Sequence, residues 1–268
     1  MSDRISISIQ DHVADVRLNR EDKLNALDYP MFEALIEAGR SLATQHGVRA
    51  VVLSGNGRAF CAGLDFASFM ALASDDGGAP DLFRRDERSP ANIAQRAGYV
   101  WKELPVPVIA AIHGVCYGGG LQIAAGADIR IVHPEAKFSI REMHWGLVPD
   151  MSGTRTLKHL LRQDVLKELT FTARIFSGTE AANLGLATRT ADDPHAAAME
   201  LAAQIASSSP TGIRAAKSLL NQAYDIADDA TGLALEEEVQ RSVLQTPNQI
   251  EAVMANLSKR APNFVDPE

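Results

Sequence analysis

The chain begins with two short segments in which apolar and polar residues alternate, Ile5 to Ile9 and Val13 to Leu18. Such alternation is typical of strands with one buried face, and the short polar break between the segments predicts a hairpin. A helix is expected next, because Asp28 is a candidate N-cap, Pro30 stands near the start, and apolar residues recur at helical spacing as far as Leu42. The chain is therefore predicted to open as strand, strand, helix.

Two continuous apolar runs follow, Val48 to Leu53 and Val108 to Ile112, and each predicts a strand buried on both faces. After the second run, Gly118-Gly119-Gly120 precedes Leu121 to Ala127, a small-residue segment with helical spacing. The glycines have two open interpretations. They could let helix and strand pack closely, or they could expose N–H donors at a helix N-terminus to a developing negative charge.

The second half of the chain is predicted to be mostly helical. Lys137 to Ile140 is expected to form one more strand, and no strand pattern follows Pro210. The expected helices are Val165 to Ala173 and Glu180 to Leu184 (with Asp164 and Thr179 as candidate N-caps), His195 to Ser207, Ile213 to Tyr224, Ala230 to Leu244 and Asn248 to Leu257. The apolar stripes of the last three must pack on a core of their own or on a neighbouring subunit.

The stretch from Asp75 to Ser89 is charged, contains glycine and lacks periodicity, so it is predicted to be a mobile loop. Its arginines, Arg84, Arg85 and Arg88, could meet a phosphate group. We favour a solvated charge run as the explanation for them.

Composition limits the function. A chain of 268 residues can bury one large core, alone or with a small appendage. No apolar run is long enough to span a bilayer, and the N-terminus lacks the layout of a signal peptide, so we expect a cytoplasmic protein with no membrane partner. A net charge of −8 and a pI near 5.4 argue against nucleic acid as a partner. Cys61 and Cys116 cannot supply a disulfide framework or a four-ligand metal site, so free thiols are expected.

Several nucleotide and hydrolase motifs are missing. The sequence contains no G-x-x-x-x-G-K-[ST], no H-E-x-x-H and no G-x-S-x-G. Gly55-Asn56-Gly57 starts like a dinucleotide fingerprint, but Phe60 stands where the third glycine belongs. An NAD oxidoreductase is therefore weakly supported.

Four segments together carry a recognisable pattern: Arg20 to Leu27 (REDKLNAL), Gly57 to Asp65 (GRAFCAGLD), His113 to Gly120 (HGVCYGGG) and Phe138 to Thr154 (FSIREMHWGLVPDMSGT). In this order and spacing the chain resembles the crotonase superfamily, the enoyl-CoA hydratase/isomerase family. The resemblance implies an α/β fold, a spiral of strand-strand-helix repeats over residues 1–205 followed by a helical trimerisation region over 206–268. It also implies an acyl-CoA substrate, no separate cofactor, and a homotrimer or a dimer of trimers.

The same resemblance implies an oxyanion hole for the thioester carbonyl, built from the backbone N–H groups of Leu64 and Gly119. Converting a thioester to an enolate places charge on one oxygen, and each well-aimed N–H is worth about 3–4 kcal/mol there. The residues implied in binding the substrate's CoA moiety are Lys23, Leu24, Ala26, Ala62 and Asp65.

Three residues are candidates for proton transfer. Glu142 occupies the position of the second glutamate of family hydratases, and we predict that it is the base; the alternative is a surface ion pair with its neighbour Arg141. The first glutamate is replaced by Gln122, which can orient a group but cannot accept a proton at neutral pH. Asp150, eight residues after Glu142, is either a second acid, as the spacing in family dienoyl-CoA isomerases suggests, or the cap of a helix beginning near Ser152.

With one well-placed glutamate, the favoured reaction is double-bond isomerisation of an enoyl-CoA. Hydration of a 2-enoyl-CoA is the alternative. It is less favoured, because two carboxylates normally share the tasks of activating water and delivering a proton. A catalytically idle acyl-CoA-binding protein is the alternative from another class.

Overall fold

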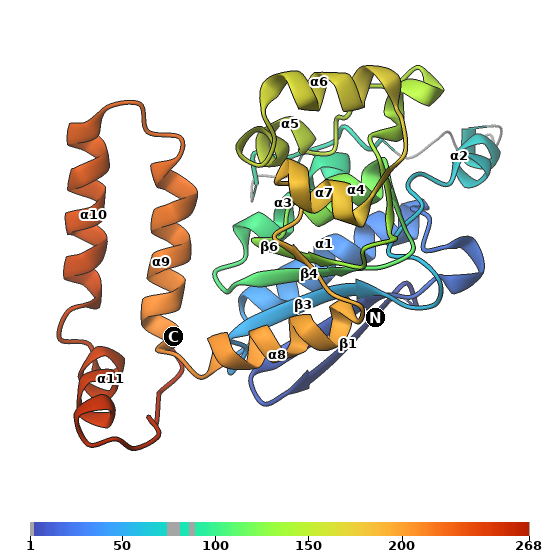
Figure 1. Ribbon diagram of the computed structural model, residues 1–268. Helices are drawn as coiled ribbons and strands as arrows, with labels where there is room; N and C mark the ends of the chain where they lie inside the picture. The colour runs from blue at the N-terminus through green and yellow to red at the C-terminus, as the bar shows by residue number, and fades with distance from the viewer. Residues whose placement is uncertain (1–2, 74–80, 86–88, 268) are drawn as a thin grey trace.

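The computed structural model describes residues 3–73, 81–85 and 89–267, and in these residues two sheets form the centre of the fold (Figure 1). The large sheet has the strand order β1-β2-β3-β4-β6-β9 and the small sheet the order β5-β7-β8. The strands of the large sheet are β1 (Ile5–Gln10), β2 (Val13–Leu18), β3 (Ala50–Gly55), β4 (Val108–Ile112), β6 (Ile129–Val132) and β9 (Arg189–Thr190). Those of the small sheet are β5 (Val115–Tyr117), β7 (Lys137–Ser139) and β8 (Phe176–Ser177).

Helices cover both faces of the large sheet and fill the second half of the chain. They are α1 (Tyr29–Ala43), α2 (Phe66–Ala73), α3 (Ile93–Glu103), α4 (Gly119–Ala125), α5 (Gly153–Thr156), α6 (Gln163–Thr172), α7 (Gly178–Leu184), α8 (Pro194–Ala206), α9 (Pro210–Ala223), α10 (Asp229–Val243) and α11 (Pro247–Leu257). Three 3₁₀ helices complete the described elements: η1 (Glu21–Lys23), η2 (Arg141–Trp145) and η3 (Leu157–His159).

The central strands are buried on both faces, as their continuous apolar runs predicted. Along β3, Val51 and Leu53 belong to the core that includes α1, α3 and α4, whereas Ala50 and Val52 belong to the core under α8. This alternation follows from the period of two in a strand, where successive side chains point to opposite faces. Both sets must then be apolar, because helices exclude water from each side (Figure 1).

The chain passes repeatedly from the large sheet to the small one. β4, β6 and β9 pair within the large sheet, while their sequence neighbours β5, β7 and β8 pair within the small sheet. Helices separate these strand pairs, and the predicted spiral of strand-strand-helix repeats is confirmed. The consequence for function is that the loops after β3 and β4 lie together at one edge.

The predicted hairpin of β1 and β2 and the helix α1 are confirmed. β1 and β2 are antiparallel, and the Asp28 carboxylate accepts a hydrogen bond from the Met31 N–H at 3.0 Å, as expected of an N-cap. The carboxylate also pairs with Arg4 at 2.6 Å, so the start of α1 is tied to the chain just before β1.

Several boundaries differ from the prediction because strand pairing, not local hydrophobicity, sets them. β3 begins at Ala50 instead of Val48, since its parallel pairing with β2 starts at the Val13–Ala50 pair. β7 ends at Ser139, where its pairing with β5 ends. The central helix α4 begins at Gly119, inside the glycine triplet, because hydrogen bonding of the helix already includes the Gln122 N–H and the Gly118 carbonyl.

Two predicted helix caps are wrong. Asp164 lies inside the first turn of α6, whose N-cap is Arg162. Thr179 likewise lies inside α7, and the cap is the hydroxyl of Ser177, which accepts from the Glu180 N–H at 3.1 Å. In both cases the helix starts earlier than the apolar periodicity indicated. The loop predicted for Asp75 to Ser89 falls mostly outside the described residues, including Arg88, and Arg84 and Arg85 are exposed.

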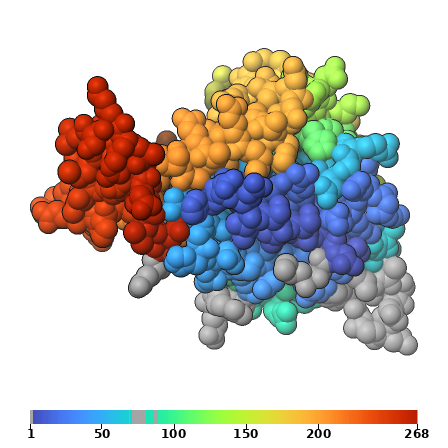
Figure 2. Space-filling model, turned by 90° about the horizontal axis from the view of Figure 1, so that it is seen from below, coloured from blue at the N-terminus to red at the C-terminus, as the bar shows by residue number. Residues whose placement is uncertain are grey.

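Helices α9 to α11 stand apart from the body as a separate lobe (Figures 1 and 2). Lys217 on α9 joins the lobe to the body: its ammonium donates to the carbonyls of Trp101 and Val106 at 3.2 and 2.9 Å and pairs with Asp128 at 2.7 Å. As expected, no strand follows Pro210 in the described residues. None of the described helices is long and apolar enough to cross a membrane.

Candidate active site

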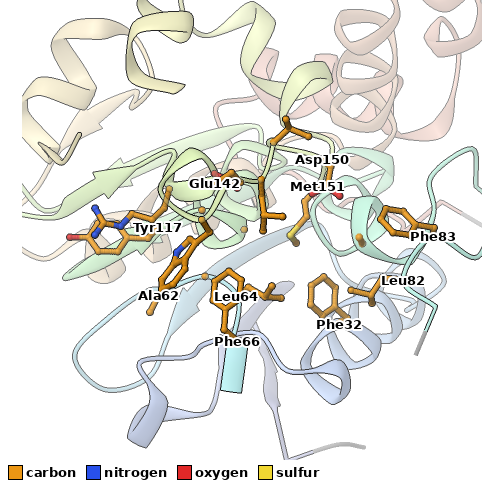
Figure 3. Close-up of a pocket in the computed structure, with 18 of the residues that line it drawn as sticks. Phe32, Ala62, Leu64, Phe66, Leu82, Phe83, Tyr117, Glu142, Asp150 and Met151 are labelled. Atoms are coloured by element: carbon orange, nitrogen blue, oxygen red, sulfur yellow. The ribbon is translucent and has the colours of Figure 1, made fainter. Parts of the chain in front are cut away.

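A pocket of about 790 Å³ opens between the glycine loops, η2 and α1 (Figure 3). Its lining residues are Phe32, Ala62, Gly63, Leu64, Phe66, Asp81, Leu82, Phe83, Ala94, Tyr117, Gly118, Gly119, Arg141, Glu142, Trp145, Leu147, Val148, Asp150 and Met151. Phe32, Leu82 and Phe83 gather at one end, away from Tyr117 (Figure 3). The pocket therefore combines a long apolar region with three carboxyl groups, those of Asp81, Glu142 and Asp150.

The loops after β3 and β4 run side by side. The Cys61 N–H donates to the Val115 carbonyl and the Tyr117 N–H to the Cys61 carbonyl, both at 3.0 Å. A Cβ placed on Gly63 would lie 3.8 Å from the Gly119 nitrogen, so the ends of the two loops are adjacent. The structure thus brings together the two predicted oxyanion residues, Leu64 and Gly119, on the pocket wall.

The N–H groups of Leu64 and Gly119 have no acceptor within the described part of the chain. At Leu64 this follows from the parallel bridge with Leu27, in which the flanking Gly63 carbonyl and Asp65 N–H make the hydrogen bonds. At Gly119 it follows from the position, because the first amides of a helix have no partner in the preceding turn. Two adjacent unpaired N–H donors can bind an oxygen that gains negative charge.

Glu142 lies on η2 and is 8% exposed, although it lines the pocket. Its Oε1 accepts a hydrogen bond from the Gln122 amide at 2.5 Å, while Oε2 is buried and has no partner within the described residues. Burial raises the pKa of the Glu142 carboxyl, the Gln122 hydrogen bond lowers it, and the charge of Asp150 raises it further, with a net upward shift. The alternative expected from the sequence, a surface ion pair with Arg141, is not observed in the described structure.

Gln122 on α4 is 1% exposed and lies behind Glu142, not on the pocket wall. Its carbonyl oxygen accepts from the N–H groups of Met151 and Gly153 at 2.9 and 3.0 Å. Both ends of the amide are therefore engaged by protein groups.

Asp150 is exposed and lines the same pocket as Glu142 (Figure 3). The capping role suggested by the sequence is not observed, because α5 has Ser152 as its N-cap residue and no side chain caps it. Among the described residues, none donates a hydrogen bond to the Asp150 carboxylate. The carboxylate is free to meet a ligand or solvent.

The residues implied in CoA binding occupy different places in the structure. Ala62 lines the pocket, whereas Lys23, Leu24 and Ala26 lie beside it; Lys23 is exposed, and the Leu24 carbonyl accepts from the Ala62 N–H at 2.9 Å. Asp65 is engaged elsewhere, by Arg20 at 2.8 Å and the Ser68 hydroxyl at 2.7 Å. Burial alone would raise the pKa of Asp65, but these hydrogen bonds outweigh it and lower the pKa to about 2.

Two residues that support the site were quoted in the first motif but given no role by sequence reasoning. Asn25 is fully buried, and its amide donates to the carbonyls of Asn56 and Ala59 at 2.9 and 2.8 Å, which fixes the loop after β3. Arg20 bridges Asp28 and Asp65, so it connects the start of α1 to the end of that loop. The signal available in the sequence was an asparagine inside the REDKLNAL motif, because an amide that becomes buried on folding needs hydrogen-bond partners.

The mouth of the pocket carries an aromatic pair. The rings of Phe66 and Trp145 have centroids 4.4 Å apart, and Trp145 is 55% exposed. The Arg141 guanidinium lies over the Tyr117 ring at 5.6 Å from its centroid. Trp145 thus lines the pocket, and Cys61 and Cys116 are buried free thiols, as expected from the sequence. No group of acidic, histidine or cysteine residues suited to a metal ion occurs in the described residues.

Comparison with known proteins gives a consistent result. Residues 8–267 match the family model described as enoyl-CoA hydratase/isomerase. The chain is 35% identical to the mitochondrial Delta(3,5)-Delta(2,4)-dienoyl-CoA isomerase of Mus musculus, over 94% of this chain and 79% of that protein. It is 31% identical to the mitochondrial methylglutaconyl-CoA hydratase of the same organism, over 92% and 77%. The crystal structure of an enoyl-CoA hydratase from Bacillus anthracis superposes with a TM-score of 0.86 at 29% identity, covering 97% of this chain and 98% of that one.

Proposed function

Since this chain belongs to the enoyl-CoA hydratase/isomerase family, we propose that it moves a double bond along the acyl chain of an enoyl-CoA. The observation that carries the proposal is the carboxyl arrangement of the pocket. One buried glutamate, Glu142, has a single unpaired oxygen, and the residue beside it is an amide, Gln122. The similarity to a dienoyl-CoA isomerase supports the same reaction class.

The first step is removal of a proton from the carbon next to the thioester carbonyl. The Glu142 carboxylate takes the proton, and the electron pair of the broken C–H bond moves into the thioester to form an enolate. The Leu64 and Gly119 N–H groups stabilise the oxygen that becomes negative, each by about 3–4 kcal/mol. Their lack of any other acceptor among the described residues supports this assignment, since no existing hydrogen bond must break.

The second step returns a proton to a different carbon. With a 3-enoyl-CoA, the protonated Glu142 can give it back within the same pocket. With a 3,5-dienoyl-CoA the proton leaves C2 and one is added at C6, four bonds away, so a second group is needed. We assign that group to Asp150, which lines the same pocket and is exposed. After each turnover Glu142 releases the proton taken from C2 and Asp150 takes one from water, so both carboxyls return to their starting states.

Hydration is the alternative, and relatives named as hydratases favour it. It requires a group that deprotonates water as well as one that delivers a proton. Gln122 cannot accept a proton, and it lies behind Glu142 with both ends of its amide hydrogen-bonded. Hydration would therefore have to use Asp150 in place of Gln122, and we favour isomerisation because the similarity to a dienoyl-CoA isomerase supports it.

The test is to supply 3,5-dienoyl-CoA, 3-enoyl-CoA and 2-enoyl-CoA in heavy water and to follow products by mass spectrometry. We expect isomerisation of the first two, with deuterium incorporated, to exceed hydration of the third. Faster hydration would favour the hydratase alternative. Tight binding with neither product nor deuterium exchange would identify an idle acyl-CoA-binding protein.

Asp150→Asn should slow dienoyl-CoA isomerisation by about 10- to 100-fold while 3-enoyl-CoA isomerisation changes less, because only the longer transfer needs a second carboxyl. The substitution also removes a negative charge that raises the Glu142 pKa, so the acid limb of the pH profile should move to lower pH. Steady-state kinetics on both substrates across pH measure the two effects. Equal loss on both substrates, or an unmoved acid limb, would contradict this assignment.

We propose that residues 206–268 form an oligomerisation region and that the protein is a homotrimer or a dimer of trimers. The support is the large apolar residues exposed on α9 to α11: Leu220, Leu233, Ile250, Val253, Met254 and Leu257. Large apolar side chains exposed in this number on one lobe are typical of interfaces, and closed symmetry favours such assemblies.

Light scattering at micromolar concentration should therefore give three or six times the 28.8 kDa mass of the chain. Leu233→Glu should shift the protein toward smaller species, whereas Gln240→Glu adds the same charge on α10 without removing an apolar side chain. A monodisperse monomer for the unmodified protein would refute the assembly.

A cytoplasmic location and the absence of a separate cofactor belong to the same proposal. The curated relatives include proteins named as mitochondrial and peroxisomal.

A further inference from the structure

Gln122 occupies the space between the base and the segment that carries Asp150. It reaches Glu142 Oε1 at 2.5 Å on one side and the Met151 and Gly153 N–H groups at 2.9 and 3.0 Å on the other. We propose that Gln122 is a positioning residue, which fixes the orientation of the Glu142 carboxylate and holds it in a set relation to Asp150. This inference rests on the proposed function, because it concerns how the base of that reaction is held.

The orientation of the Gln122 amide is determined by its neighbours. Two backbone N–H groups donate to one end of the amide, so that end must be the carbonyl oxygen. The NH₂ end then faces Glu142 and acts as the donor. A donor fixed at Oε1 sets the rotation of the Glu142 carboxylate, and Oε2 is left buried without a partner among the described residues.

An amide suits this place better than a carboxylate or an apolar side chain. A second carboxylate at the same distance could not remain ionised together with Glu142, because like charges that close share a proton. A leucine would supply no donor, and the Glu142 carboxylate would lose the hydrogen bond that offsets the effect of burial on its pKa. Gln122 therefore supports the ionised form of the base without adding charge.

The link to Asp150 runs through the backbone. Met151 directly follows Asp150, and its N–H and that of Gly153 share the Gln122 carbonyl oxygen. Position 153 has to be glycine for this contact, because a Cβ there would lie 2.6 Å from the Gln122 Oε1. A shift of Gln122 would thus move the base and the Asp150 segment together.

The charged surroundings of Glu142 are few. Arg141 and His144 lie with it on η2, and Asp81 and Asp150 line the pocket. α4 carries no charged residue, and the charged side chains of α6, which packs against η2, are exposed. Asp150 is the one of these that shifts the Glu142 pKa, in the upward direction.

The test compares Gln122→Leu with the unmodified protein and with Gln204→Leu, a control at an exposed glutamine of α8. For Gln122→Leu we expect kcat for isomerisation to fall by about 10- to 100-fold, since small misplacement of a reacting group has effects of this size. KM and the calorimetric affinity for acyl-CoA should stay nearly unchanged. The acid limb of the pH profile should move to higher pH, because Glu142 loses a hydrogen bond that favours its ionised form.

Gly153→Ala should reproduce both the loss of kcat and the shift of the acid limb, because the added Cβ displaces Gln122 without altering it. Gln122→Glu should isomerise enoyl-CoA only at pH values where the introduced carboxyl and Glu142 share one proton. At those pH values the protonated carboxyl can donate to Glu142 in place of the Gln122 amide. These two variants keep the inference testable if Gln122→Leu does not fold, which circular dichroism would show.

The outcomes separate the two proposals. If the unmodified protein does not isomerise any enoyl-CoA, the proposed function fails. If it does, and Gln122→Leu keeps both its kcat and its pH profile, the positioning role is overturned. That role is also overturned if Gln122→Glu keeps full isomerase activity at neutral pH and gains hydration of 2-enoyl-CoA, because the side chain would then reach the substrate directly.

Discussion

Glu142→Gln is expected to lower kcat for enoyl-CoA isomerisation by about 10²–10⁴-fold, the usual contribution of a positioned general base. Acyl-CoA affinity should change little, because the substitution keeps the shape of a side chain that is 8% exposed. The introduced amide can still accept the Gln122 hydrogen bond through its carbonyl oxygen. What it cannot do is take a proton from the substrate.

The pH dependence gives an independent check of the same residue. The base must be ionised, and burial raises the pKa of Glu142, so activity of the unmodified protein should rise with pH through an acid limb above the range of an ordinary glutamate. The residual activity of Glu142→Gln should lack this limb. Stopped-flow kinetics and calorimetric binding, with the exposed Glu135→Gln as control, make the measurement. A variant with unchanged kcat would remove Glu142 from the mechanism.

Removing the hydrogen-bond donor of Leu64 should lower kcat by about 10²–10³-fold, the cost of losing one donor to an oxyanion. The cleanest change replaces Leu64 by its α-hydroxy acid analogue, which turns the N–H into an ester oxygen and leaves the side chain intact. The fold should tolerate this change, because that N–H has no acceptor among the described residues.

Gly119→Pro removes the other donor but is a harsher test. Even a Cβ at this position would lie 2.7 Å from Met151 Sδ and 2.8 Å from Leu27 Cδ1, so repacking accompanies the lost N–H. Its activity is informative only if circular dichroism and particle mass are unchanged. Full activity of the Leu64 ester protein would show that no oxyanion is stabilised by that amide.

Much of the fold was accessible from the sequence because it depends on local patterns. The runs in β3 and β4 had to be strands covered on both sides, and the Asp28 cap and the hairpin of β1 and β2 follow from residues close in the chain. Boundaries that depend on pairing were less accessible. β3 begins at Ala50 because of its partner β2, and α6 and α7 begin before their apolar periodicity does.

The order and spacing of four motifs in the sequence determined the family and the main site candidates: Leu64, Gly119, Glu142 and Asp150 all line one pocket. Only the tertiary structure decided how Gln122 is used. Its partners lie 20 to 31 residues away, on η2 and before α5, and no local periodicity specifies contacts made by packing α4 against those segments. The same packing buries Glu142 and leaves Asp150 exposed, and so gives two carboxyl groups of one short segment different environments.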